Sequence, residues 1–302
     1  KYSHPEWLLK KIKTDWPQSE AFGWQQILDA NNQRPDFWLR VNKQFHSTSD
    51  YLQLLQEKEI EATPSTVASQ ALKLSQGIDV RQLPEFSEGA VSVQDVGAQL
   101  TAELLHLEPG LRLLDLCAAP GGKTCHILET AESIKSLVAV ESDESRMLRV
   151  QENIQRLKLD TQVKPELVVA DARDYKQWWN GEVFDRILID APCSASGVIR
   201  RHPDIKTLRR ESDIEVLVKL QAEILQSAWQ MLSPGGEMLY VTCSVFKDEN
   251  QHQMQRFFSV NDGAEELPID AQWGQRCDYG RQLFPGDFDA DGFYFCRIKK
   301  GL

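Results

Sequence analysis

Two cysteines stand where a reactive thiol would be useful, and each is followed by a serine. Cys193 ends Asp190-Ala-Pro-Cys193, and Cys243 follows the apolar run 238–242. If both segments end parallel strands, both thiols lie at the ligand edge of one sheet, near helix N-termini that favour the thiolate. A thiolate that adds to carbon-6 of a pyrimidine makes carbon-5 nucleophilic, provided that the base leaves its stack. The pair therefore indicates covalent activation of a base toward a methyl donor. Burial as small apolar residues is the alternative for either cysteine alone.

Four successive predicted strands finish with a carboxylate at the carboxyl end: Asp115, Glu141, Asp171 and Asp190. Burying an unpaired carboxylate is costly, and the carboxyl ends of parallel strands form the ligand edge of a sheet. An acid after the second strand can accept hydrogen bonds from both hydroxyls of a ribose, and one after the third from an adenine amino group. A helix N-cap is the alternative for any one of them, Asp171 included. Four in succession favour a cofactor that carries a nucleoside.

The stretch Asp115-Leu-Cys-Ala-Ala-Pro-Gly-Gly-Lys123 predicts the turn that would hold this cofactor. An apolar strand runs into it, Pro120-Gly121-Gly122 allows close backbone approach, and a helix begins at Lys123. A phosphate-binding P-loop needs glycine at position 117, where Cys117 stands, and the dinucleotide spacing Gly-x-Gly-x-x-Gly is absent. A cofactor without pyrophosphate, S-adenosylmethionine rather than NAD, fits better. A structural turn with no ligand stays open for this stretch taken alone.

The elements that must position these residues alternate between strand and helix after residue 110. We expect strands over 111–116, 137–140, 167–170, 184–189, 238–242 and 293–298, with amphipathic helices between them. This order predicts an α/β fold with a mainly parallel sheet and right-handed crossovers. Residues 1–90 predict a small mixed α/β domain, and residues 91–302 the main domain, with a boundary near Ser87-Glu88-Gly89.

The composition indicates whether this chemistry involves a metal and in which compartment it takes place. The 302 residues include six cysteines without a Cys-x-x-Cys pair, so a zinc or other metal site is not expected. Scattered cysteines fit a reducing cytoplasm, and the sequence contains neither a secretory leader nor an apolar run long enough for a bilayer. We expect a monomer. Because the chain begins at Lys1 without methionine, we also expect a fragment of a longer protein.

A basic run interrupts an otherwise acidic chain of net charge −11. It comprises Arg200, Arg201, His202, Lys206, Arg209 and Arg210. Charge alone favours a solvated surface here, since an acidic protein is not a general nucleic-acid binder. A local basic patch can nonetheless contact the phosphates of a polyanion.

Three motifs in the same order resemble the RNA (cytosine-5) methyltransferases of the Sun/Fmu type. They are Asp115–Lys123, Asp190-Ala-Pro-Cys-Ser194 and Thr242-Cys-Ser244, and the segments 92–95, 197–204 and 291–293 are also similar. The resemblance implies a Rossmann-like methyltransferase sheet, mostly parallel with an antiparallel last strand, and S-adenosyl-L-methionine as donor. It also implies that an N-terminal RNA-binding domain of the family is missing from this chain.

The resemblance also implies roles for single residues. Cys243 would be the nucleophile, Cys193 would assist release of the methylated RNA, and Asp190 would complete the catalytic set. The cofactor would be held by Cys117, Ala118, Ala119, Pro120, Gly121, Gly122, Lys123, Glu141, Asp171 and Asp190. The proteins that the chain resembles often have aspartate where Glu141 stands, and a glutamate can still bind the ribose diol.

The expected partner is small-subunit (16S) ribosomal RNA, which Arg200, Arg201, His202 and Lys206 would contact through phosphates. The small domain over 1–90 would help to position that RNA. Two other functions stay open from the sequence, a transfer-RNA cytosine-5 methyltransferase and a non-catalytic RNA-binding assembly factor with the same fold.

Overall fold

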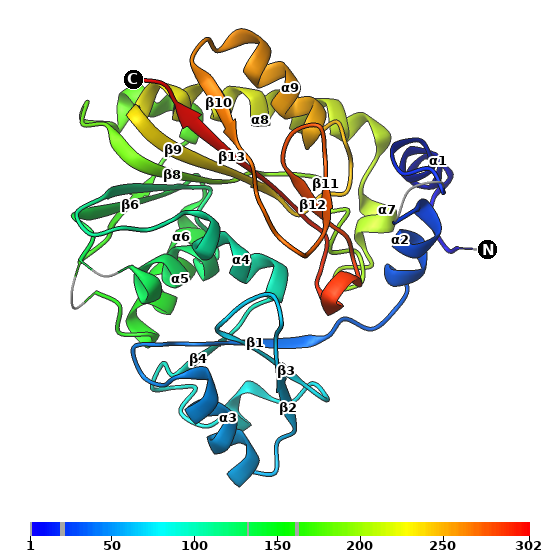
Figure 1. The fold of residues 1–302 in the computed structure, drawn as a ribbon, viewed down its shortest axis with the longest axis vertical. Helices are drawn as coiled ribbons and strands as arrows, with labels where there is room; N and C mark the ends of the chain where they lie inside the picture. Colours follow the sequence, from blue (N-terminus) through cyan, green and yellow to red (C-terminus); the bar gives the residue numbers. More distant parts are fainter. Residues whose placement is uncertain (1, 19–21, 132, 161–162) are drawn as a thin grey trace. The chain divides into compact units, whose positions relative to one another are not determined.

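The computed structural model describes residues 2–18, 22–131, 133–160 and 163–302, and the chain divides into two compact units (Figure 1). The first unit combines Lys1–Pro35, Ile189–Gln230 and Pro234–Leu302. The second combines Asp36–Leu188 and Met231–Ser233. Among the described residues, no helix has the length and apolarity needed to cross a membrane.

The second unit contains the predicted parallel strands. β5 (Arg112–Leu116), β6 (Ser136–Glu141) and β7 (Glu166–Val169) pair in parallel, and β8 (Phe184–Asp190) begins beside β5. Helices follow β5 and β6 as α5 (Gly122–Thr130) and α6 (Glu144–Arg156), and a 3-10 turn, η2 (Ala172–Gln177), follows β7. β5 and β6 are buried apolar strands, as the continuous Leu, Val and Ala runs require. The expected alternation of strand and helix is confirmed from β5 to β7, whereas the 3-10 turn η2 stands between β7 and β8 where a helix was expected.

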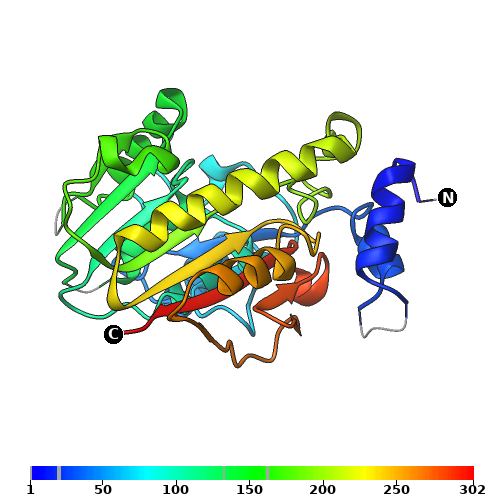
Figure 2. The same cartoon turned by 90° about the horizontal axis from the view of Figure 1, so that it is seen from above.

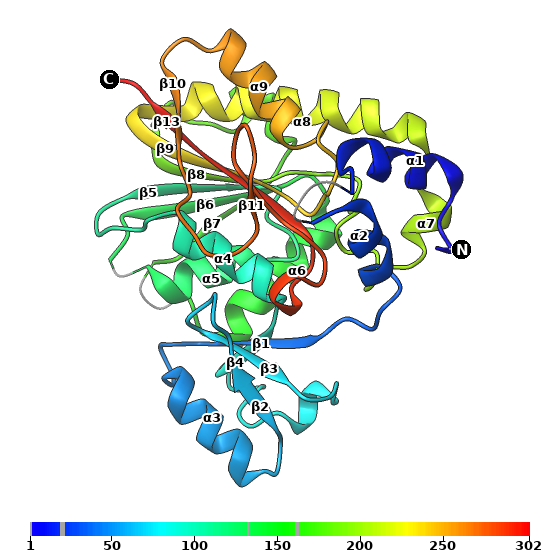
Figure 3. The same cartoon turned by 45° about the vertical axis from the view of Figure 1, so that its right-hand side comes forward.

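A smaller antiparallel sheet, in the order β2-β3-β1-β4, also lies in the second unit. Its strands are β1 (Phe37–Val41), β2 (Ala62–Pro64), β3 (Ala71–Leu74) and β4 (Val91–Val93). The helix α3 (Thr48–Glu57) packs on this sheet through Tyr51 and Leu55, both fully buried (Figure 3). The 3-10 turn η1 (Val80–Gln82) follows β3, and α4 (Val96–Leu104) follows β4.

The first unit contains the antiparallel strands. β9 (Leu232–Thr242) pairs antiparallel with the last strand, β13 (Phe293–Lys300), so the predicted antiparallel last strand is confirmed. Three short strands that the sequence analysis did not predict extend this region: β10 (Ala264–Leu267), β11 (Gln275–Arg276) and β12 (Arg281–Leu283). The helices are α7 (Ile205–Leu208), α8 (Glu211–Met231) and α9 (Gln251–Val260), and a 3-10 turn η3 (Asp287–Asp289) precedes β13. α8 and α9 lie side by side (Figure 2), with Gln253 donating to the carbonyl of Val218 at 3.3 Å.

The two N-terminal helices pack within the first unit, against the segment that follows Cys243. α1 (Glu6–Asp15) and α2 (Trp24–Ala30) share one buried apolar cluster with Val245 and Phe246. Trp16 Nε1 donates to the carbonyl of Val245 at 2.7 Å, and Lys11 Nζ pairs with Asp248 at 2.6 Å. The lysine-rich helix α1 thus supports the chain just after the predicted nucleophile.

Candidate active site

The predicted cofactor loop of the second unit is a tight turn between β5 and α5. The Ala119–Pro120 peptide is cis, and both Cys117 (φ 65°) and Gly121 (φ 96°) have left-handed backbone conformations. A Cβ on Gly121 would meet the Cα of Val150 at 3.0 Å, so glycine is required both for conformation and for space. The loop therefore has one well-defined backbone path at the carboxyl end of β5.

Asp115 and Glu141, the acids of β5 and β6, are both buried, and their surroundings differ. Asp115 Oδ2 accepts a hydrogen bond from Thr124 Oγ1 at 2.5 Å, which ties the strand to the first turn of α5. Glu141 lies beside the cofactor loop, where its Oε2 accepts from the Ala119 amide at 3.3 Å. Its Oε1 accepts from the Asp143 amide at 3.1 Å, from Ser142 Oγ at 3.2 Å and from Arg146 Nη1 at 3.3 Å. A carboxylate has about four acceptor positions, so Oε2 retains one for a ribose hydroxyl, and a second hydroxyl would replace one of the long contacts of Oε1. This arrangement fits the predicted cofactor.

Asp171, the acid after β7, is the N-cap of η2. This is the alternative role that the sequence analysis left open for it. Its Oδ1 accepts from the Arg173 amide at 2.9 Å, and its Oδ2 accepts from Arg173 Nη2 at 2.6 Å. These hydrogen bonds lower the pKa of the Asp171 carboxyl, which stays an anion. An adenine amino group would have to share this carboxylate with Arg173.

The two predicted reactive cysteines of the first unit lie next to each other. The Sγ atoms of Cys193 and Cys243 are 3.4 Å apart, and both side chains are partly exposed. The hydrogen bond to Cys243, burial and the nearby Glu249 carboxylate raise the pKa of the Cys193 thiol well above its usual range. The direction of this shift favours a protonated Cys193 thiol beside Cys243.

Backbone contacts hold the two cysteine segments together. The Ala191 amide donates to the carbonyl of Val241 at 2.9 Å, and the Gly197 amide donates to the carbonyl of Cys243 at 2.9 Å. A Cβ on Gly197 would lie 2.2 Å from the carbonyl oxygen of Gly292, so two glycine backbones meet here without side chains between them. Asp190, the remaining predicted catalytic residue, ends β8 immediately before this segment and is partly exposed.

A buried carboxylate that the sequence analysis missed joins the two segments. Glu249 is 0% exposed and accepts hydrogen bonds from the serines that follow the cysteines, Ser194 Oγ at 2.6 Å and Ser244 Oγ at 2.5 Å. The repeated Cys-Ser pair was the available signal in the sequence. Ser244 is five positions from Glu249, but Ser194 is 55 positions away, so the link between the two cysteine segments could not be predicted from neighbouring residues.

The structure separates the members of the basic run. Arg200 is 7% exposed, and its Nε donates to Asp291 Oδ1 at 2.6 Å, so its guanidinium has an internal role. Arg201 also pairs with Asp291 but is partly exposed, and His202 lies on the surface. Lys206, also partly exposed, donates to Asn32 Oδ1 at 2.6 Å. The burial of Arg200 argues against the expectation that this side chain contacts phosphate.

Arg209, in the same run, donates from Nη2 to the carbonyl of Cys193 at 3.1 Å and from Nε to that of Ser194 at 3.2 Å. It therefore supports the cysteine segment.

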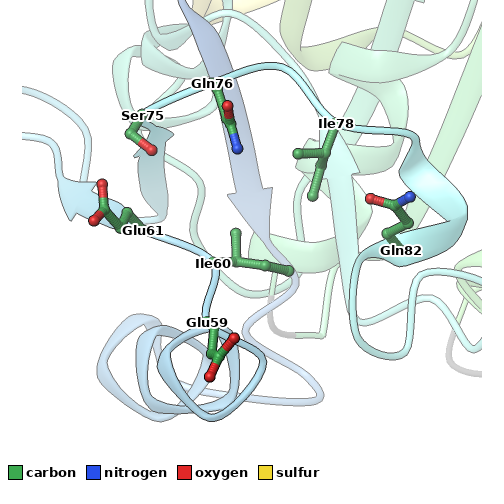
Figure 4. A pocket seen from close by; sticks show the side chains of 7 residues that line it. All are labelled: Glu59, Ile60, Glu61, Ser75, Gln76, Ile78 and Gln82. Atoms are coloured by element: carbon green, nitrogen blue, oxygen red, sulfur yellow. The ribbon is translucent and has the colours of Figure 1, made fainter.

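A hollow of about 470 Å³ beside the small sheet contains none of the predicted site residues (Figure 4). Its lining includes the carboxylates Glu59 and Glu61. Two acids with no basic residue in the lining would repel a phosphate backbone. Within the described ranges, no three His, Cys, Asp or Glu side chains gather into a group that could hold a metal ion.

Parallel strands β5 to β7 with a glycine turn after β5, an acid at the end of β6 and an antiparallel last strand define a Rossmann-like methyltransferase fold. Residues 102–299 match the family described as 16S rRNA methyltransferase RsmB/F, and residues 4–81 match the ferredoxin-like domain of RsmF/B-like methyltransferases. The chain belongs to the 16S rRNA methyltransferase RsmB/F family, which confirms the family resemblance of its motifs. S-adenosyl-L-methionine is the cofactor, which confirms the expectation drawn from the turn after β5 and from the family resemblance, and it carries the nucleoside that the strand-end acids predicted.

Curated relatives and solved structures extend this similarity over almost the whole chain. The ribosomal RNA small subunit methyltransferase B of Vibrio cholerae is 50% identical over 301 residues, 99% of this chain and 66% of that protein. The protein of the same name from Pseudomonas putida is 47% identical over 298 residues, again 99% of this chain and 66% of the relative. The chain thus spans slightly less than two thirds of the length of these relatives.

Among solved structures, PH0851 has a TM-score of 0.91 at 29% identity and covers 99% of this chain and 66% of its own. NSun6 from Pyrococcus horikoshii, solved with SFG, has a TM-score of 0.87 at 19% identity, with 98% of both chains covered, and supports the fold alone.

Proposed function

We propose that this chain methylates carbon-5 of a cytosine in 16S ribosomal RNA through a covalent cysteine adduct. The observation that carries the proposal is the pair of thiols at 3.4 Å, one of which is kept protonated. Methyl transfer to an exposed oxygen or nitrogen has no use for two thiols, whereas carbon-5 of a pyrimidine needs a nucleophile at carbon-6 to become reactive. Relatives named for small-subunit ribosomal RNA support the substrate class.

Each residue then has a defined task. Cys243 Sγ forms a bond to carbon-6 of the cytosine, and carbon-5 becomes the nucleophile. Bound S-adenosylmethionine supplies an electrophilic sulfonium methyl group to the site. After transfer, a base removes the proton from carbon-5, the carbon-5–carbon-6 double bond forms again, and the bond between carbon-6 and Cys243 breaks, which restores the Cys243 thiolate. The Cys193 thiol assists this release, and Asp190 completes the catalytic set.

We assign the cofactor to the second unit by the fit of its residues. The turn over Cys117–Lys123 would surround the methionine part, Glu141 would accept the ribose hydroxyls, and Asp171 and Asp190 would complete the pocket. We retain the domain division into 1–90 and 91–302, the cytoplasmic location and the monomeric state as parts of the proposal. The first of these domains would position the RNA.

Glu141→Gln should weaken donor binding. The change keeps the shape of the side chain and removes its charge, and a hydrogen bond to a charged group contributes about 1.5–3 kcal/mol. We therefore expect the Kd of S-adenosylmethionine, measured by calorimetry, to rise roughly ten- to a hundredfold. Glu144→Gln, an exposed residue in the first turn of α6, is the matched control. Equal affinities in the two variants would contradict the ribose assignment.

Arg200→Ala and Arg201→Ala should have different effects. Removing Arg200 leaves the buried Asp291 carboxylate with one partner fewer, and breaking a buried ion pair costs about 3–5 kcal/mol, so thermal unfolding should occur at a lower temperature. Arg201→Ala should instead weaken RNA binding and lower the slope of log K against log salt by about 1. Arg149→Ala, exposed on α6, is the control of equal charge. An Arg201 variant with the slope of this control would remove Arg201 from the RNA surface.

The proposed function is tested by methyl transfer from labelled S-adenosylmethionine to three substrates, followed by nucleoside analysis. The substrates are unmodified transcripts of 16S RNA, unmodified transcripts of transfer RNA, and DNA oligonucleotides. We expect 5-methylcytidine in 16S RNA alone. Label in transfer RNA alone would instead support a transfer-RNA methyltransferase. Binding of RNA without any transfer would support an assembly factor, and a methylated nucleoside other than 5-methylcytidine would overturn the chemistry.

A further inference from the structure

The side chains that fix the two cysteine segments converge on one buried group. Glu249 Oε1 accepts from the Ser194 amide at 2.8 Å and from Gln221 Nε2 at 3.1 Å, while its Oε2 accepts from the hydroxyls of Ser194 and Ser244. Four donors thus surround a carboxylate that no solvent reaches. Such a group is stable only when its hydrogen bonds are complete, so the positions of all four donors are restricted together.

Hydrogen bonds of three serines connect Glu249 to the backbone around both cysteines. The hydroxyls of Ser194, Ser196 and Ser244 lie 3.1 Å from one another. Ser196 Oγ accepts from the Val245 amide at 3.0 Å, and Ser244 Oγ accepts from the Phe246 amide at 3.0 Å. The segments that carry Cys193 and Cys243 therefore share one polar core. A small displacement of Glu249 would move both segments.

We propose that Glu249 is a positioning residue that sets the spacing of the two thiols through Ser194 and Ser244, and that its carboxylate controls the reactivity of Cys193. The effect of Glu249 on catalysis rests on the proposed function, whereas its effect on the spacing of the thiols is a property of the protein without RNA or donor. A neutral amide at this position has one acceptor oxygen and an NH₂ group facing hydroxyl donors, so it cannot accept the same four hydrogen bonds.

Among the described residues of the first unit, Cys243 and Glu249 are the titratable groups that act on the Cys193 thiol. Cys243 and Glu249 raise the pKa of its thiol, and the Tyr240 hydroxyl, which donates to the Glu249 carbonyl at 2.8 Å, stays neutral because burial raises its pKa well above the usual value. Arg209 reaches only the carbonyl oxygens of Cys193 and Ser194. Removing the Glu249 carboxylate should therefore lower the pKa of the Cys193 thiol.

The test is alkylation of each cysteine by iodoacetamide between pH 6 and pH 10, without RNA or donor, read for each residue by mass spectrometry. In Glu249→Gln we expect the profile of Cys193 to move about one pH unit lower, because a nearby negative charge is lost. Glu237 lies on β9, the strand that ends just before Cys243, and its carboxylate pairs with Arg297, so Glu237→Gln should leave the profile unchanged. A Cys193 profile in Glu249→Gln that superimposes on the wild type would overturn the inference.

Methyl transfer separates this inference from the proposed function. Glu249→Gln should lower kcat about tenfold or more and leave the KM for donor within twofold, since the residue acts through the cysteines. If wild-type protein transfers no methyl group while the alkylation shift is present, the proposed function fails and the positioning role stands. A normal kcat with an unshifted profile refutes the positioning role alone.

Ser244→Ala and Ser194→Ala extend the test should Glu249→Gln not fold. Burial raises the pKa of the Glu249 carboxyl, and the two serine hydroxyls oppose that rise by donating to its ionised form. Each serine variant removes one of these donors, so each should shift the Cys193 profile in the same direction by a smaller amount. Two folded serine variants with wild-type profiles would likewise overturn the inference.

Discussion

Cys243→Ser is expected to abolish methyl transfer while RNA and donor still bind. A serine hydroxyl is not ionised near neutral pH, and adding to carbon-6 of a cytosine needs a thiolate. We expect transfer of labelled methyl groups to fall by about a thousandfold or more, with RNA affinity unchanged within a factor of about two.

Cys277→Ser is the matched control for this change. Cys277 is a free thiol of the first unit, and burial raises its pKa to about 12, so it should not react. Its replacement should leave the rate unchanged. A Cys243→Ser enzyme with normal activity would remove Cys243 from the role of nucleophile.

Cys193→Ala is expected to trap the RNA on the protein. Breaking the bond between carbon-6 and Cys243 is the step that Cys193 assists, and its thiol lies 3.4 Å from the leaving sulfur. Without it, the adduct should accumulate as a protein–RNA band that survives denaturation in a gel, and turnover should fall about a hundredfold or more. One methyl group should be transferred for each enzyme molecule.

The double variant Cys193→Ala with Cys243→Ser is the control for the trapped adduct, and it should form no band. The two assignments would be reversed if Cys243→Ser methylated normally while Cys193→Ala gave neither adduct nor product. An adduct that includes no transferred methyl group would place the block before transfer, which also contradicts a role of Cys193 in release.

The sequence alone determined the parts of this protein that depend on local patterns. Apolar runs predicted β5, β6 and the second half of β9, and Pro-Gly turns marked the starts of the first and last of these runs, since strands and turns follow from neighbouring residues. The acid after β6 and the two Cys-Ser pairs were identified because parallel strands end at one edge of a sheet. The short strands β10 to β12 were missed, because their few residues have no clear alternation.

Only the tertiary structure decided which charged side chains are internal. From the sequence, Arg200 is expected to be a surface cation within a basic run. In the structure it is buried and pairs with Asp291, 91 positions away. Trp16 supports Val245 across 229 positions, and Glu249 joins Ser194 to Ser244. Such contacts depend on how distant segments pack, and no short-range periodicity encodes them. The sequence thus identified the two thiols, and packing alone revealed the carboxylate that links their segments.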